Sequence, residues 1–279
     1  MTKIFNKLFI SIIKIPKFGN IFFFKILFRN RKFLFKSVKE IKSFKKKILF
    51  ELNLDDWIQS QIYFLDKYED YEINVVSEVL KEGDVFVDVG ANFGLYSLWS
   101  SKIVGDSGRI FSFEPFEINL SSLNKNIELN SLSNIIVIDK AVTDKISDIR
   151  LFFNERDQNL GMVSTFNFDN GISTKVQTIS LDNFFSENEI SSIKFIKIDI
   201  EGGEYLALLG MSETLRKYRP IVQIEIDDSI LENTPYNKED IFNYFKSIEY
   251  EVFSPELKRN KYLKKSIHSK NYYFKSSVN

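Results

Sequence analysis

Two short segments of the sequence combine residue types that can do chemistry. The first is Asp88-Val-Gly90-Ala91-Asn92-Phe-Gly94, which follows a short apolar run. Gly90 allows the chain to turn sharply out of that run, and Gly94 lets the next helix pack closely while leaving space for a ligand. Asp88 adds a negative charge, which suits a sulfonium and an amino-acid ammonium better than a pyrophosphate. The segment therefore predicts a site for a positively charged nucleoside cofactor.

An acid at the end of the next apolar run supports this interpretation. Glu114-Pro115 comes about twenty residues later, where an acid typically accepts hydrogen bonds from both ribose hydroxyls of such a cofactor. Together the two features predict binding of S-adenosylmethionine. One alternative is a tight turn without a ligand, which leaves the two matched features unexplained. The other is NAD, which is disfavoured because the spacing is not G-x-G-x-x-G and because Asp88 would lie near the phosphates.

The second segment is Lys197-Ile-Asp199-Ile-Glu201-Gly-Gly-Glu204, in which a glycine pair separates an apolar run from a helix. Ligands of open α/β sheets lie beyond the carboxyl ends of the strands. Carboxylates gathered there require a cation, and a sulfonium, Lys197 or a divalent metal would each serve. The plainer alternative is that Glu201 and Glu204 only begin a helix, where acids are favourable. Four acids are expected at this rim: Asp88, Glu114, Asp199 and Glu225.

The residue inventory limits the chemistry to carboxylates, lysines, hydroxyls and a cofactor. The chain has no cysteine and a single histidine, His268, so thiolate metal sites are excluded and a histidine-based triad is disfavoured. We expect Asp199 or Glu201 to act as general base towards a hydroxyl, with Lys197 orienting the acid or the substrate. The alternative is a Mg²⁺ ion that bridges Asp199 and Glu225.

The pattern between these motifs alternates between strands and helices. Short apolar runs predict buried parallel strands, and longer amphipathic runs predict helices. The alternation predicts an α/β fold with a doubly wound, parallel sheet, preceded by one or two linking helices over residues 51–71. We expect strands over 84–89, 109–114, 135–139, 193–199 and 220–226, and helices over 73–80, 95–104, 118–129, 204–215 and 237–248.

Two further regions depart from this alternation. Residues 148–181 contain three β-type runs, 149–153, 162–166 and 176–181, which predict a small β insertion over the catalytic face. Near the end of the chain, the runs 250–253 and 272–274 predict an antiparallel pair.

The first fifty residues differ from the rest in charge. They hold 14 Lys and Arg against one acid, Glu40, so they carry +13 and the remaining chain −13. Lysines interleaved with Phe, Ile and Leu predict amphipathic helices over residues 3–15 and 21–50, with apolar stretches too short to span a membrane. This basic arm, residues 1–50, would lie on an anionic membrane surface or pack on a catalytic domain of residues 51–279. Nucleic acid is not expected as a partner, because no recognition motif accompanies the arm.

The ordered motifs resemble those of the FkbM-type methyltransferases. The resemblance covers residues 54–227 and leaves out the basic arm and the tail after Ser254. It is carried by six segments: Asp88–Tyr96, Glu114-Pro115, Ala141–Asp144, Lys197–Glu204, Asp56–Gln61 with Tyr68-Glu69 after it, and Thr178–Asp182.

The resemblance implies a class I methyltransferase (Rossmann-like) fold with a mostly parallel, seven-stranded sheet. It also implies methyl transfer from S-adenosylmethionine to a hydroxyl of a sugar, glycan or secondary metabolite. An amine acceptor, or a non-catalytic partner in glycan assembly that keeps the fold, are the alternatives. We expect the protein in the cytoplasm, with peripheral attachment to the inner face of the membrane through the arm. The implied roles are as follows: Gly90, Ala91, Asn92 and Gly94 line the methionine and ribose, Glu114 with Pro115 after it holds the ribose, Lys140 and Ala141 lie near the adenine, and Asp199 and Glu201 face the substrate.

Overall fold

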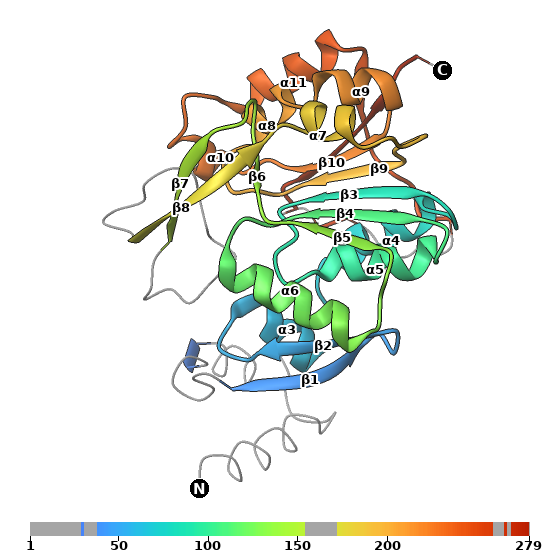
Figure 1. The fold of residues 1–279 in the computed structure, drawn as a ribbon, viewed down its shortest axis with the longest axis vertical. Coiled ribbons are helices and arrows are strands. Elements are labelled where there is room, and N and C mark those ends of the chain that lie inside the picture. The colour runs from blue at the N-terminus through green and yellow to red at the C-terminus, as the bar shows by residue number, and fades with distance from the viewer. Residues whose placement is uncertain (1–28, 31–37, 154–171, 259–264, 267–268, 279) are drawn as a thin grey trace, which may run out of the picture. The chain divides into compact units, whose positions relative to one another are not determined.

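The computed structural model describes residues 29–30, 38–153, 172–258, 265–266 and 269–278 (Figure 1). The chain divides after Glu69 into two compact units. Within the described residues, no helix is long and apolar enough to cross a bilayer.

The first unit contains a β-hairpin and a helix. Strands β1 (Lys39–Phe44) and β2 (Ile48–Asn53) pair antiparallel, and helix α3 (Trp57–Leu65) follows. Ile48, Phe50 and Leu52 alternate along β2 and are all fully buried, which is the period of a strand with one face in a core. The side chain of Asp56 begins α3 by accepting a hydrogen bond from the backbone N–H of Gln59 at 2.8 Å.

The hairpin corrects the prediction of a helix over residues 21–50. That prediction is wrong over 39–50, where the turn between the strands carries positive φ angles at Lys45 and Lys46. Apart from Arg29 and Asn30, which are helical, residues 1–37 of the arm lie outside the described residues. The linking helix expected over 51–71 is present only from Trp57, because β2 continues to Asn53.

The second unit is built on a seven-stranded sheet in the order β11-β12-β10-β9-β3-β4-β5. The five strands from β10 to β5 run parallel, and β12 is antiparallel to both of its neighbours. The predicted mostly parallel sheet and the predicted terminal antiparallel pair are therefore confirmed. The strand bounds are β3 Val85–Val89, β4 Arg109–Phe113, β5 Ile135–Ile138, β9 Phe195–Ile198, β10 Ile221–Glu225, β11 Tyr250–Phe253 and β12 Asn271–Ser276.

Helices cover both faces of this sheet, as a doubly wound fold requires (Figure 1). One face is covered by α4 (Asp70–Val79), α5 (Leu95–Val104) and α6 (Glu117–Leu129). The other is covered by α7 (Leu181–Glu187), α8 (Glu204–Leu209), α9 (Ser212–Tyr218) and α11 (Lys238–Ser247).

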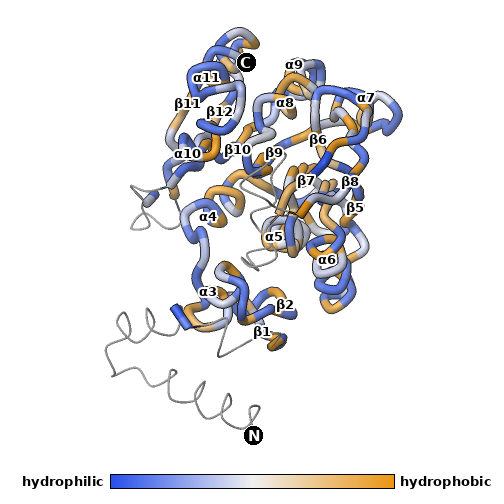
Figure 2. The backbone as a smooth tube through the Cα atoms, turned by 90° about the vertical axis from the view of Figure 1, so that its left-hand side faces the viewer, coloured by the Kyte–Doolittle hydropathy of each residue, from blue (hydrophilic) through white to orange (hydrophobic). Residues whose placement is uncertain are grey.

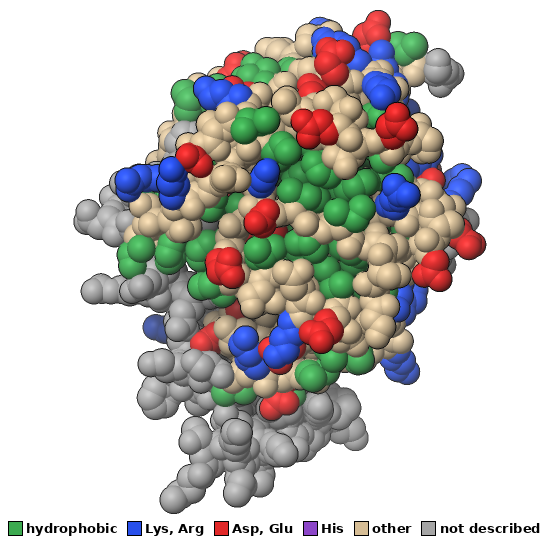
Figure 3. Space-filling view, in the orientation of Figure 1, with side chains coloured by type: hydrophobic (Ala, Val, Ile, Leu, Met, Phe, Trp, Pro, Cys, Tyr) green, Lys and Arg blue, Asp and Glu red, His purple; other side chains and the backbone are tan. Residues whose placement is uncertain are grey.

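The core lies between the sheet and these helices. All five residues of β3 and all four of β9 are buried, and each large aliphatic side chain buried there contributes about 1.5–3 kcal/mol. Figure 2 shows the same division, with hydrophobic colour along the strands and hydrophilic colour on outer loops and helix ends. Ile136 of the edge strand β5 is 43 % exposed. Figure 3 shows that apolar side chains reach the surface across the middle of this face of the molecule.

The helix predicted over 204–215 is wrong in one respect, because it is broken into α8 and α9. The break falls at Gly210, whose backbone packs directly on the loop after β6 (Ala141–Val142). A Cβ at Gly210 would lie 1.9 Å from the carbonyl oxygen of Thr143, so only glycine allows this approach. The chain therefore turns where a side chain would force the two segments apart.

The β insertion is a separate three-stranded sheet in the order β6-β8-β7. Strand β7 (Asp148–Phe153) confirms the run predicted over 149–153. Strand β8 (Ile172–Ile179) begins earlier than predicted and ends at Ile179, because Leu181 opens α7. The run predicted over 162–166 lies outside the described residues.

Candidate functional site

The carboxyl ends of the parallel strands bring the predicted acids to one rim. In the register of the sheet, Asp88 of β3 pairs with Ser112 of β4 on one side and Lys197 of β9 on the other. The backbone N–H of Asp199 donates to the carbonyl oxygen of Val89 at 3.0 Å, so the two chemical segments meet directly. The rim arises because parallel strands all end at the same edge.

Asp88 is a fully buried carboxylate behind the turn. Its Oδ2 accepts a hydrogen bond from Ser97 Oγ at 2.5 Å, and Ser97 in turn contacts Ser112 Oγ at 2.7 Å. Its Oδ1 has no hydrogen-bond partner among the described residues. Burial raises the pKa of Asp88, and the charge of Lys197 offsets part of that rise.

The backbone of the turn after β3 packs directly against the backbone at the end of β9. Gly90 has φ +86°, and a Cβ there would lie 1.9 Å from the carbonyl oxygen of Asp199. Gly94 precedes α5 with φ +98°, and Asn92 between them also has a positive φ, of 52°. Ala91 between them is buried. The backbone of this turn is therefore fixed by positions that favour glycine.

Glu114 ties the turn to the end of β4. Its carboxylate accepts hydrogen bonds from the backbone N–H groups of Asn92 at 2.7 Å and Phe116 at 2.9 Å, and from the side chain of Asn119. Burial raises the pKa of Glu114 to about 7, against these hydrogen bonds. A carboxylate offers about four acceptor positions, so its own chain leaves room for about one more bond. A contact with both ribose hydroxyls would require one of these three bonds to be exchanged.

The remaining predicted cofactor residues lie at the ends of β4 and β5. Pro115 is half-buried directly after Glu114. Lys140 is half-buried just past β5, and Ala141 is buried where β6 pairs with Thr178 of β8. Their position beside the turn agrees with the expected site, while their contact with an adenine stays a prediction.

Lys197 supplies the cation that the acids of the rim require. Its ammonium is 2.8 Å from Asp199 Oδ2 and 4.8 Å from the ring centroid of Tyr96, and the side chain is almost fully buried. Asp199 is 29 % exposed and opens to the solvent side. The pair therefore places an ionised carboxylate at the surface of the rim and its counter-charge beneath it.

Asp199 also contacts the side chain of Glu225 at the end of β10. Burial alone would raise the pKa of Asp199, but Lys197 and the hydrogen bonds from Glu225 and Lys197 outweigh it and lower the pKa below its usual range. Two carboxyl groups hydrogen-bond each other only through a proton on one of them. Within the described part of the chain, no three acids or histidines are arranged to hold a metal ion. A Mg²⁺ bridge between Asp199 and Glu225 therefore stays a hypothesis.

Glu201 has the opposite electrostatic environment. Burial and the neighbouring charges of Asp199, Glu204 and Asp227 raise its pKa to about 8, and Lys270 offsets only part of the rise. Its backbone has a positive φ of 53° in the loop after β9. Because a carboxyl with this pKa is mostly protonated at neutral pH, Glu201 can both give and take a proton there.

The alternative that Glu204 begins a helix is confirmed, because it is the first residue of α8, whereas sequence reasoning missed the partners that come from distant segments. The carboxylate of Glu204 accepts from the backbone N–H of Gly202 at 3.0 Å, so it closes its own loop rather than facing outward. Asp227 forms an ion pair with Lys270 at the same rim. A small cavity of about 10 Å³ lies among these acids and Glu225. The Asp227–Lys270 pair joins residues 43 positions apart, which no local pattern could indicate.

Comparison with known families agrees with this geometry. Residues 88–252 match the methyltransferase FkbM domain, and that stretch contains the turn, the acid after β4 and the whole carboxylate rim. The chain belongs to the FkbM methyltransferase family.

Individual relatives are distant. The hexuronic acid methyltransferase AglP of Haloferax volcanii is 24% identical over 150 residues, which are 54% of this chain and 59% of that protein. The chain thus matches less than two thirds of that relative. Among solved structures, the methyltransferase FkbM of Methylobacillus flagellatus is 18% identical, with a TM-score of 0.46 over 79% of this chain and 61% of that one. An S-adenosylmethionine-dependent O-methyltransferase of Thermotoga maritima is 13% identical, with a TM-score of 0.46 over 78% of this chain and 70% of that one.

Proposed function

We propose that the chain transfers the methyl group of S-adenosylmethionine to a hydroxyl of a sugar, glycan or glycolipid. The observation that carries this proposal is the pair of neighbouring carboxyl groups with opposite pKa shifts, Asp199 and Glu201, at the strand ends beside the turn. The family supports methyl transfer. The named activity of AglP towards a hexuronic acid supports a sugar acceptor.

The residues around the turn fit the methyl donor in two respects. The buried Oδ1 of Asp88 has no donor among the described residues, and an acceptor oxygen left unpaired behind the turn favours a ligand that carries positive charge and hydrogen-bond donors over an anionic one. Glu114 keeps capacity for about one further hydrogen bond, enough for a ribose hydroxyl. When bound, the donor would supply a methyl group attached to a sulfonium sulfur, and that sulfur leaves readily as the thioether of S-adenosylhomocysteine. Gly90, Ala91, Asn92 and Gly94 would hold it through the backbone, with Pro115, Lys140 and Ala141 at its nucleoside end.

The rest of the chemistry falls to the protein, which must orient a hydroxyl and take its proton. Asp199 is ionised but has a low pKa, so it is a weak base that can orient the hydroxyl by accepting its hydrogen bond. Glu201 has a pKa of about 8 and is the better proton acceptor once ionised. Lys197 holds Asp199 in place, and Asp199 in turn raises the pKa of Glu201. We assign the general base to Glu201 and substrate orientation to Asp199.

Two measurements test the proposal. Calorimetric titration of the intact chain with S-adenosylhomocysteine should show stoichiometric binding, and absence of binding would refute the donor site. Transfer of labelled methyl groups to a panel of saccharides and matched amino sugars should then give product on hydroxyl oxygen, as located by mass spectrometry.

Matched variants locate the chemistry within the rim. Glu201→Gln should lower turnover by about 10²–10⁴-fold while nucleoside binding persists. Glu251→Gln, an exposed acid of β11, serves as the control and should leave turnover unchanged. Assay in excess chelator tests the Mg²⁺ hypothesis, because full activity there would exclude an ion bridging Asp199 and Glu225.

A further inference from the structure

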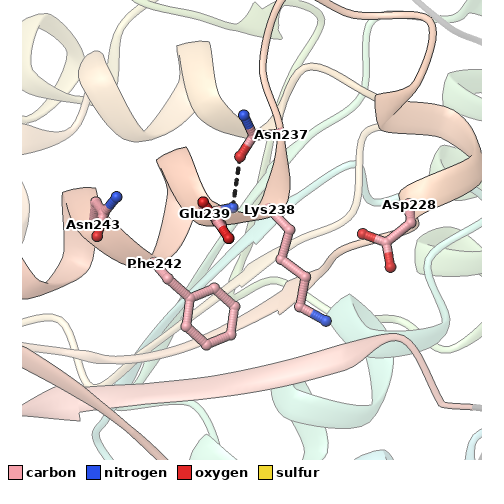
Figure 4. Close-up of a pocket in the computed structure, with 6 residues that line it drawn as sticks. All are labelled: Asp228, Asn237, Lys238, Glu239, Phe242 and Asn243. Carbon is pink, nitrogen blue, oxygen red and sulfur yellow. Dashed lines mark hydrogen bonds between the residues drawn. The ribbon is translucent and has the colours of Figure 1, made fainter.

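A hollow of about 660 Å³ lies between α10 (Asp228–Leu231) and the first turns of α11 (Figure 4). Two segments of the chain run from the carboxylate rim to this hollow. Asp228, at one wall, directly follows Asp227 of the rim. Strand β12 begins at Asn271, which pairs with Glu225, and continues into Tyr272 beside the hollow. A molecule bound at the rim could therefore extend into this space.

Two lysines converge on the ring of Tyr272 beside the hollow, and one of them, Lys238, lines it. Lys238 donates a hydrogen bond to the hydroxyl of Tyr272, and its ammonium lies 4.4 Å from the ring centroid. The ammonium of Lys265 lies 5.0 Å from the same centroid and donates to the carbonyl oxygen of Asn271. Among the described residues neither lysine forms an ion pair, although acids pair with Lys270 and Lys275 on the same strand. Like charges near one ring are unfavourable unless an anion lies between or beside them.

The other walls suit a saccharide. Phe242 offers an apolar ring that packs edge-on against Tyr272, with 5.4 Å between ring centroids. Asn237 and Asn243 bring amide groups to the lining, and Glu239 adds a second carboxylate besides Asp228. Figure 4 shows the ammonium of Lys238 between Phe242 and Asp228, on the side that faces Asp228. An apolar wall with a few convergent polar groups is typical of small-molecule sites.

We propose that this hollow is an acceptor subsite that binds an anionic substituent, a carboxylate or a phosphate, on the saccharide to be methylated. Lys238 is its principal contact and Lys265 adds positive potential, while Phe242 packs against the sugar ring. The inference rests on the proposed function for its saccharide, and it adds that the acceptor is charged.

The test uses the full chain saturated with S-adenosylhomocysteine and three probes: methyl glucuronide, glucose 6-phosphate and the neutral methyl glucoside. Binding is followed by calorimetry or ligand-observed NMR at low salt. At least one anionic probe should bind about tenfold more tightly than the glucoside, and the tighter of the two identifies carboxylate or phosphate as the source. Lys238→Gln should weaken the anionic probe about tenfold, and Lys238→Arg should retain most of its affinity.

A third variant tests whether the bound substituent is negatively charged, and a fourth serves as a control. Asp228→Asn removes an acid from the lining and should leave anion binding unchanged or tighter, whereas weaker binding would overturn the proposal. Lys275→Gln, an exposed lysine paired with Glu251, is the matched control and should have no effect. Equal affinity for charged and neutral probes, no binding of either anionic probe, or an unchanged affinity in Lys238→Gln would each overturn the subsite. Binding of S-adenosylhomocysteine is measured first, so that failure of the donor site is distinguished from failure of the acceptor subsite.

Discussion

The pH dependence of turnover distinguishes the two carboxyl groups of the rim. If Glu201 takes the proton, its pKa of about 8 leaves about 1% of molecules ionised at pH 6 and about 10% at pH 7. Turnover should therefore rise about tenfold per pH unit below pH 8 and level off above it. If Asp199 takes the proton instead, its low pKa keeps it ionised throughout this range, and the profile should be flat.

The assay is initial-rate methyl transfer from pH 5.5 to 9.5 at saturating donor, with a neutral-pH folding check by circular dichroism. Asp199→Asn provides the second half of the test, because the charge of Asp199 is the largest electrostatic contribution to the raised pKa of Glu201 after burial. In that variant the inflection should move below pH 8. A flat wild-type profile, or an inflection that Asp199→Asn leaves in place, would refute the assignment of Glu201 as base.

Four other outcomes follow from the structure. Lys197→Met leaves the carboxylate of Asp199 without its buried partner, and we expect the free energy of unfolding in urea to fall by about 3 kcal/mol, the lower end for such pairs because Asp199 is partly exposed. Gly90→Ala forces a Cβ against the carbonyl of Asp199, so calorimetry should detect no S-adenosylhomocysteine binding; wild-type affinity would contradict the close approach. The raised pKa of Glu201 means that the folded state binds a proton more tightly than the unfolded chain, so stability should fall as pH rises from about 4.5 to 8, and less so in Glu201→Gln, as urea titrations at several pH values will show. Deleting residues 1–37, which spares the hairpin, should reduce co-sedimentation with anionic vesicles but not with neutral ones; unchanged sedimentation would exclude the arm as an anchor.

The central fold could be predicted from the sequence because its signals are local. The strands β3 and β9 are continuous apolar runs that end in the chemical segments, and their helices follow at once. The hairpin β1–β2 was missed because its turn uses Lys45 and Lys46 with positive φ, where glycine or asparagine would have marked it. The period of two in β2 was also concealed, because the exposed Leu49 makes its first three residues uniformly apolar. The break at Gly210 depends on the approach of Thr143, which only the folded chain creates.

In the candidate site, too, local contacts could be predicted from the sequence and contacts between distant segments could not. Residues two apart on a strand share a face, so the contact of Lys197 with Asp199 follows from their spacing alone. The ion pair of Asp227 with Lys270 does not, because β12 reaches the rim from the far end of the sequence. Nor does the ionisation of Glu201, since burial is the largest cause of its raised pKa and burial is a property of the fold.

The two carboxyl groups differ because Asp199 directly follows strand β9, whereas Glu201 lies further along in the loop. Asp199 continues the line of β9 and so receives the ammonium of Lys197 from the same face. Glu201 lies two residues further, in the loop where the backbone turns through a positive φ. It is surrounded by Asp199, Glu204 and Asp227 instead, so the same rim stabilises one carboxylate and favours protonation of the other. Environments that separate the pKa values of adjacent acids are how a site obtains distinct roles from one residue type. Here the separation follows from position, because Asp199 pairs with Lys197 at 2.8 Å while Glu201, in the glycine-bearing loop after β9, has mainly acids as its charged neighbours.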